Sequence, residues 1–82
     1  MKGEKMIKKV YEVYIDNLSS EERSQVMGIL EKNAYMAQSH ISGKFIVAFF
    51  DRAPNLKTIL ANYNVEIKNV TDQDLIKKYY GR

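Results

Sequence analysis

Residues 42–50 read SGKFIVAFF, and this stretch decides the fold. Its last six residues are all apolar, and a short apolar run that follows a turn signal is typical of a buried strand. Gly43 can adopt the positive φ that a tight hairpin requires, so residues 35–41 are expected to form an antiparallel partner strand. The stretch therefore predicts a hairpin inside a sheet.

The apolar strand has to divide its side chains between two faces of the sheet. Successive side chains of a strand point in opposite directions, so every second residue shares a face. We expect Phe45, Val47 and Phe49 to face the core. Ile46 and Ala48 then lie on the opposite face.

Upstream of the hairpin, residues 7–15 alternate in a way that predicts another strand. Val13 and Ile15 fall on one side of it, which we assign to the core. Val10 and Tyr14 fall on the other side, together with the polar Glu12.

A helix is expected to follow over residues 20–33. Ser19 and Glu22 form a capping box, because the serine hydroxyl can accept the Glu22 amide while the carboxylate returns to the serine amide. Val26 and Leu30 recur at the spacing that keeps one helix face on a core.

Downstream of the hairpin, the sequence predicts a second helix over residues 54–62. Pro54 suits a helix start, and Asp51 is placed to cap it. Asn64 is a candidate for the left-handed residue that ends a helix. Residues 65–70 alternate again and are expected to form the last strand.

The order of elements is β-α-β-β-α-β, followed by a short C-terminal helix over residues 71–82 that Thr71 and Asp74 would cap. It predicts a single α+β domain, residues 1–82, with a core over residues 7–70. That core would hold a four-stranded antiparallel sheet with two helices on one face, the ferredoxin-like plan. If residues 34–41 formed a third helix instead, the chain would resemble the carboxy-terminal domain of the ribosomal stalk protein or the related protease adaptor.

Composition limits the classes of function. The 82 residues include no cysteine, so neither a disulfide nor a thiolate metal site can form. The net charge of +3 favours an anionic partner only slightly. Residues 45–50 are the longest apolar run, which is too short to span a bilayer, so we expect a cytoplasmic protein.

Candidate catalytic groups are explained by structural roles. His40 is the single histidine, and it has no ligand or triad partners at a suitable spacing. Asp72 and Asp74 precede the C-terminal helix, where acidic residues are favoured for capping. Neither a nucleophile nor a phosphate loop is evident. We therefore expect no enzymatic activity, no metal and no cofactor.

One motif resembles a known family. Residues 13–18, VYIDNL, resemble the shorter ribonucleoprotein motif of RNA-recognition-motif domains, whose pattern is aliphatic, aromatic, aliphatic, any, Asn, Leu. The resemblance implies that Tyr14 stands on the open sheet face and stacks a base. The longer motif of that family would fall at residues 43–49, where Lys44 and Ile46 replace its two stacking aromatics.

The sheet face away from the helices is the predicted functional surface. We expect it to present Val10, Tyr14 and Ile46, and an exposed apolar patch usually marks an interface. One hypothesis is a regulatory or adaptor protein that contacts a protein partner or a second copy of itself there, with Tyr14 as anchor. The alternative is a single-stranded RNA or DNA binder, in which Lys44 and Lys68 contact phosphates.

Overall fold

A computed structural model describes residues 9–71 of the chain. The elements in chain order are β1 (Lys9–Tyr14), α1 (Ser20–Asn33), β2 (Met36–Ser39), β3 (Phe45–Phe50), α2 (Leu56–Ile59) and β4 (Glu66–Asn69). The predicted C-terminal helix over residues 71–82, with Asp72 and Asp74, lies outside the described residues apart from Thr71.

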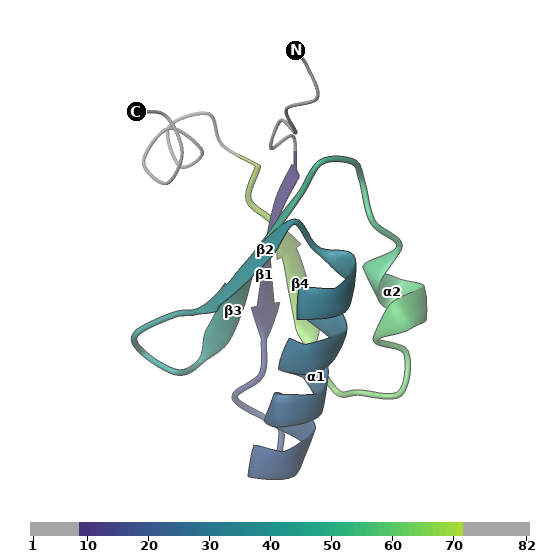
Figure 1. The fold of residues 1–82 in the computed structure, drawn as a ribbon. Helices are drawn as coiled ribbons and strands as arrows, with labels where there is room; N and C mark the ends of the chain where they lie inside the picture. The colour runs from purple at the N-terminus through teal and green to yellow at the C-terminus, as the bar shows by residue number, and fades with distance from the viewer. Residues whose placement is uncertain (1–8, 72–82) are drawn as a thin grey trace.

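The four strands form one antiparallel sheet in the order β2-β3-β1-β4. Both helices lie on the same side of this sheet (Figure 1). The predicted α+β class and the four-stranded antiparallel sheet are confirmed. The alternative with a helix over residues 34–41 is wrong, because residues 36–39 pair with β3 as a strand.

Helix α1 begins and ends at the predicted residues, and side chains fix its start. The Glu22 amide donates to the Ser19 hydroxyl at 3.2 Å, and the Ser19 amide donates to the Glu22 carboxylate at 3.1 Å. Arg23 ties the helix to the loop before it, since its Nε donates to the carbonyls of Ile15 and Leu18, each at 3.2 Å. These contacts fix the angle between β1 and α1.

The hairpin turn has the predicted glycine geometry. Gly43 has φ of 76°, in the region that favours glycine, and its amide donates to the His40 carbonyl at 2.9 Å. The His40 amide in turn donates to the Phe45 carbonyl at 2.9 Å. The turn therefore places His40 beside the first residue of β3.

The second helix is shorter than the sequence predicts. α2 covers only Leu56–Ile59, and Asp51 does not cap it. Asn55 is the N-cap residue, without a side-chain hydrogen bond, and at the other end the Leu60 amide donates to the carbonyls of both Leu56 and Thr58. Asn64 is not left-handed, because within residues 9–71 no residue other than glycine has a positive φ.

The predicted facing of β3 is wrong. Ile46 pairs with Val13 and Ala48 pairs with Tyr11, and paired residues of neighbouring strands project to the same face. Ile46 and Ala48 are therefore fully buried on the helix side. The opposite face of β3 carries Phe45, Val47 and Phe49.

Two apolar clusters hold the domain together, one on each side of the sheet. The larger lies under the helices and contains Val13, Ile15, Leu18, Val26, Leu30, Ile46, Ala48, Phe50, Leu56 and Leu60. The smaller lies on the other side and contains Val10, Val47 and Phe49. Burial of a large apolar side chain contributes about 1.5–3 kcal/mol, so both clusters matter to a chain this small.

Candidate functional site

The sheet face opposite the helices, here called the open face, is organised in three rows of side chains that run across the strands. We call them the apolar row, the middle row and the aromatic row. The apolar row is Met36, Phe49, Val10 and Val70, the middle row is Gln38, Val47, Glu12 and Lys68, and the aromatic row is His40, Phe45 and Tyr14, followed by Glu66.

The aromatic row is a stack of three rings. The His40 and Phe45 ring centroids lie 4.3 Å apart with an interplanar angle of 18°, and those of Phe45 and Tyr14 lie 4.9 Å apart at 35°. These distances match the spacing of about 4.7–4.9 Å between neighbouring strands. His40 is therefore stacked on Phe45, and the ring of Tyr14 is tilted against the other side of the row.

Charged groups surround Tyr14 at the end of this stack. Its hydroxyl donates to a Glu12 carboxylate oxygen at 2.8 Å, and the Lys68 Nζ lies 5.1 Å from its ring centroid. The hydrogen bond to Glu12 raises the pKa of Tyr14 above its usual value, followed by desolvation and by the negative charges of Glu12, Glu66 and Asp16. Three carboxylates, those of Glu12, Glu66 and Asp16, therefore act on this phenol.

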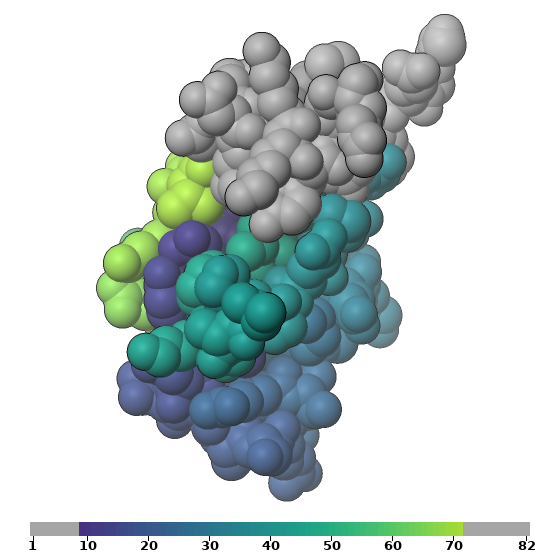
Figure 2. Space-filling model, turned by 90° about the vertical axis from the view of Figure 1, so that its left-hand side faces the viewer, coloured from purple at the N-terminus to yellow at the C-terminus, as the bar shows by residue number. Residues whose placement is uncertain are grey.

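The hairpin turn extends the surface beyond the sheet. The Ser42 amide donates to His40 Nδ1 at 3.1 Å, which holds the imidazole in place against Phe45. Ile41 follows His40 and is 98% exposed. In Figure 2 this turn, coloured teal, lies at the centre of the view between β4 and α1. The exposed isoleucine is therefore next to His40 in the chain, at the tip of the hairpin.

The predicted site residues differ in their location and exposure. Tyr14 is partly exposed on the open face, with Lys68 beside it, and Lys44 is exposed just before β3. Val10 is on the predicted face, but it is fully buried. Ile46 does not belong to the open face, because it lies in the main core.

Sequence reasoning missed two members of the aromatic row. Phe45 was expected in the core, but it pairs with Tyr14 and is only partly buried. His40 is predicted to be a partly exposed strand residue without a chemical role; it is exposed just after β2, and its ring stacks on Phe45. The register of the strand pairing could have shown this. When β3 pairs with β1 so that Phe45 lies opposite Tyr14, both rings project from the same face of the sheet.

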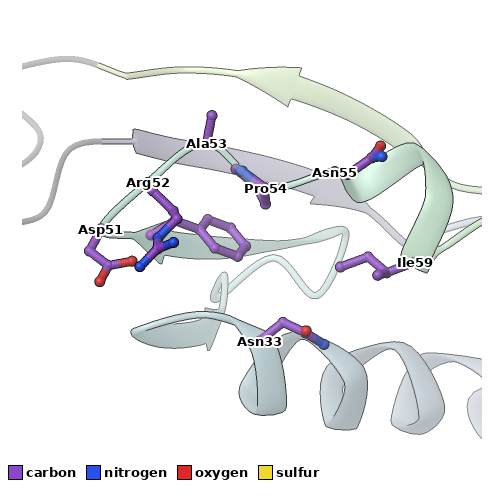
Figure 3. A pocket seen from close by; sticks show the side chains of 8 residues that line it. Asn33, Asp51, Arg52, Ala53, Pro54, Asn55 and Ile59 are labelled. Carbon is purple, nitrogen blue, oxygen red and sulfur yellow. The ribbon is translucent and has the colours of Figure 1, made fainter.

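A hollow of about 340 Å³ lies on the helix side, between the end of α1 and the loop over residues 51–55. Figure 3 shows Asn33 of α1 on one side of it, the loop residues Ala53 and Pro54 across from Asn33, and Ile59 of α2 at one end. Two further hollows of about 310 Å³ lie elsewhere, so volume does not single this one out. Its polar side chains come from Asn33, Asp51, Arg52 and Asn55 and include no nucleophile paired with a base.

Three further findings concern the class of protein to which the chain belongs. No family model, curated protein or solved structure matches the chain. Within residues 9–71, no helix is long and apolar enough to cross a membrane. The same part of the chain holds no cluster of three or more His, Cys, Asp or Glu side chains that could bind a metal ion.

Proposed function

We propose that this chain is a small non-enzymatic adaptor or regulatory domain of the ferredoxin-like plan. It acts in the cytoplasm and contacts a protein partner, or a second copy of itself, through the aromatic row. The observation that carries this proposal is the line of His40, Phe45 and Tyr14, whose side chains are exposed or partly exposed on the open face. Aromatic side chains with polar tips are enriched at the energetic centres of protein interfaces.

The arrangement of the rings favours a protein over a nucleic acid. A base stacks on the free face of an aromatic ring. Here Phe45 covers one face of Tyr14 and Lys68 lies over its ring from the side of β4, on the other flank of β1. Phe45 is itself enclosed between His40 and Tyr14. Only the outer face of His40 is left for stacking.

Charge supports the same preference. Glu12 and Glu66 stand beside Tyr14 on the open face, and both contribute to the raised pKa of its phenol. Carboxylates at this position repel a phosphate backbone, whereas a protein surface can pair them with its own Lys or Arg side chains. The ring edges between them offer apolar contact area.

A single-stranded nucleic acid remains the second candidate function. The observation in its favour is that Tyr14, the aromatic position of the resembled RNA-recognition motif, stands on the open face with the ammonium of Lys68 close by. For this function, the Lys68 side chain would move away from the Tyr14 ring when a nucleic-acid base stacks there. Lys44 would then contact a phosphate from the exposed start of β3.

Capture of partners from the native cell separates the two functions. The tagged chain is incubated with extract, with and without nuclease, over a series of salt concentrations. Nucleic-acid binding weakens steeply with salt because condensed counterions are released, whereas an apolar protein interface changes little. We expect capture of a protein that survives nuclease and salt. Loss of all capture after nuclease treatment would instead support the second candidate.

A further inference from the structure

Strand β4 forms one edge of the sheet, and among the described strands it has β1 as its single neighbour (Figure 1). The Val70 amide donates to the Val10 carbonyl at 2.9 Å, so these two residues form a hydrogen-bonded pair. Bonded and non-bonded pairs alternate along an antiparallel ladder, so Glu66 and Lys68 also direct their backbone groups to β1. Ile67 therefore directs its amide and its carbonyl outward, where no other described strand lies.

The side chains of β4 alternate between charged groups on one face and an apolar group on the other. Glu66 and Lys68 are exposed on the open face, where they pair with Tyr14 and Glu12 of β1. Ile67 projects to the helix side, where it is only partly buried and lines a hollow of about 310 Å³. The edge therefore carries opposite charges at equal distances on either side of Ile67.

This edge is complementary to a second copy of itself in one antiparallel register. With Ile67 opposite the same residue of the second copy, the two exchange amide-to-carbonyl hydrogen bonds, and Glu66 lies opposite the second copy's Lys68. Such flanking pairs are not hydrogen-bonded, so their side chains approach most closely, and opposite charges there are favourable. A register centred on Glu66 or on Lys68 places like charges opposite each other. Charge therefore selects the register centred on Ile67.

The sheet edge at β2 does not have this property. Residues Met36–Ser39 carry no charged side chain, so charge selects no register there. Charged side chains on an edge strand commonly prevent pairing with another chain. On β4 their signs and spacing exclude most pairings and favour one partner, which is a second copy of the same strand.

We propose that two copies of this chain associate through β4, in the antiparallel register centred on Ile67. The two four-stranded sheets then form one continuous sheet, with a two-fold axis perpendicular to it. This symmetry keeps the helices of both copies on one side and both aromatic rows on the other. The edge is separate from the aromatic row, so this inference goes beyond the proposed function and does not rest on it.

Sedimentation and amide hydrogen exchange of the full-length chain test the pairing. We expect a monomer–dimer equilibrium in which the Ile67 amide becomes protected as protein concentration rises. The Lys68 amide is the internal control, because it faces β1 and should be protected at every concentration. A chain that stays monomeric up to the concentrations used for NMR would overturn the proposal. So would a dimer in which the Ile67 amide exchanges as fast as in the monomer.

Charge reversal tests the register. Glu66→Lys places lysine opposite lysine across the two-fold axis, and Lys68→Glu places glutamate opposite glutamate. Each substitution should weaken the dimer by roughly tenfold or more, because two pairs per dimer change from attraction to repulsion. A mixture of the two variants should form a heterodimer, since every pair then joins opposite charges. This mixture also controls for folding, and absence of the heterodimer would contradict the register.

His40→Ala distinguishes this interface from the surface in the proposed function. His40 lies at the end of the aromatic row that is far from β4, so its loss should reduce capture of a partner and leave the dimer intact. Loss of the dimer in this variant would place the second copy on the aromatic row and overturn the inference. Unchanged capture of the partner would count against the proposed function instead, so the two failures are distinguishable.

Discussion

Tyr14 and Phe49 lie on the same sheet face, yet they serve different purposes. Phe49 has no exposed surface, whereas the Tyr14 ring is partly exposed between Phe45 and Lys68. The burial of Phe49 is a matter of stability, because a buried ring fills space that no other group can occupy. The exposure of Tyr14 makes it available to a partner.

Alanine variants of these two residues should therefore separate stability from binding. Phe49→Ala is expected to lower the free energy of unfolding by about 3–5 kcal/mol, because it leaves a cavity in the smaller apolar cluster. Tyr14→Ala should cost much less, since its ring edge already meets solvent. Denaturant melts of both variants provide the comparison. Equal destabilisation by the two substitutions would contradict the assignment of Tyr14 to the open face.

The titration of Tyr14 reports on the charges around it. The hydrogen bond to Glu12 favours the neutral phenol and raises its pKa in the folded chain. The resulting stabilisation is present below the ordinary tyrosine pKa of about 10 and is lost as pH rises through the raised value. Glu12→Gln should bring the pKa of Tyr14 down. Ultraviolet titration against a Tyr14→Phe blank measures this, and no change in the Glu12 variant would refute the contact.

At the scale of elements, local signals predicted boundaries well where side chains fix them. The capping box of Ser19 and Glu22 predicted α1 correctly, and Gly43 predicted the hairpin turn. α2 has no such cap, so the predicted helix over residues 54–62 shortens to four residues. Pro54 permits a helix start, but it does not enforce one.

The facing of β3 could not be read from its own sequence. All six of its residues are apolar, so alternation carries no information about which set faces the helices. Only the pairing of Ile46 with Val13 decides it, and that is a long-range contact. A shift by one residue exchanges the two faces of a strand, which is why Ile46 was misplaced and Phe45 was missed.

Alanine variants of Gly43 and Gly28 test whether the hairpin turn requires the positive φ of a glycine. Gly43 has φ of 76°, so Gly43→Ala should destabilise the domain by about 1 kcal/mol and loosen the contact between His40 and Phe45. Gly28 lies inside α1 with open space where a Cβ would point, so Gly28→Ala should stabilise by about 0.5–1 kcal/mol. Thermal melts of the pair give the comparison. Equal effects would show that the turn is not constrained as described.

At the scale of the whole molecule, two helices bury one face of the sheet, and the larger apolar cluster lies between them and the strands. On the opposite face, the described residues divide into a buried apolar row, which holds the smaller cluster, and an aromatic row that is exposed or partly exposed. We propose that a partner contacts the aromatic row, at one end of this face.

The most direct test of this account is nuclease-treated capture by variants of the row. Tyr14→Ala should reduce the captured protein by roughly tenfold or more, as the loss of an interface anchor does. Tyr35→Ala removes an exposed aromatic ring that lies outside the row, so this variant should capture as much as the unmodified chain. Equal capture by the Tyr14 variant and the unmodified chain would contradict the central claim.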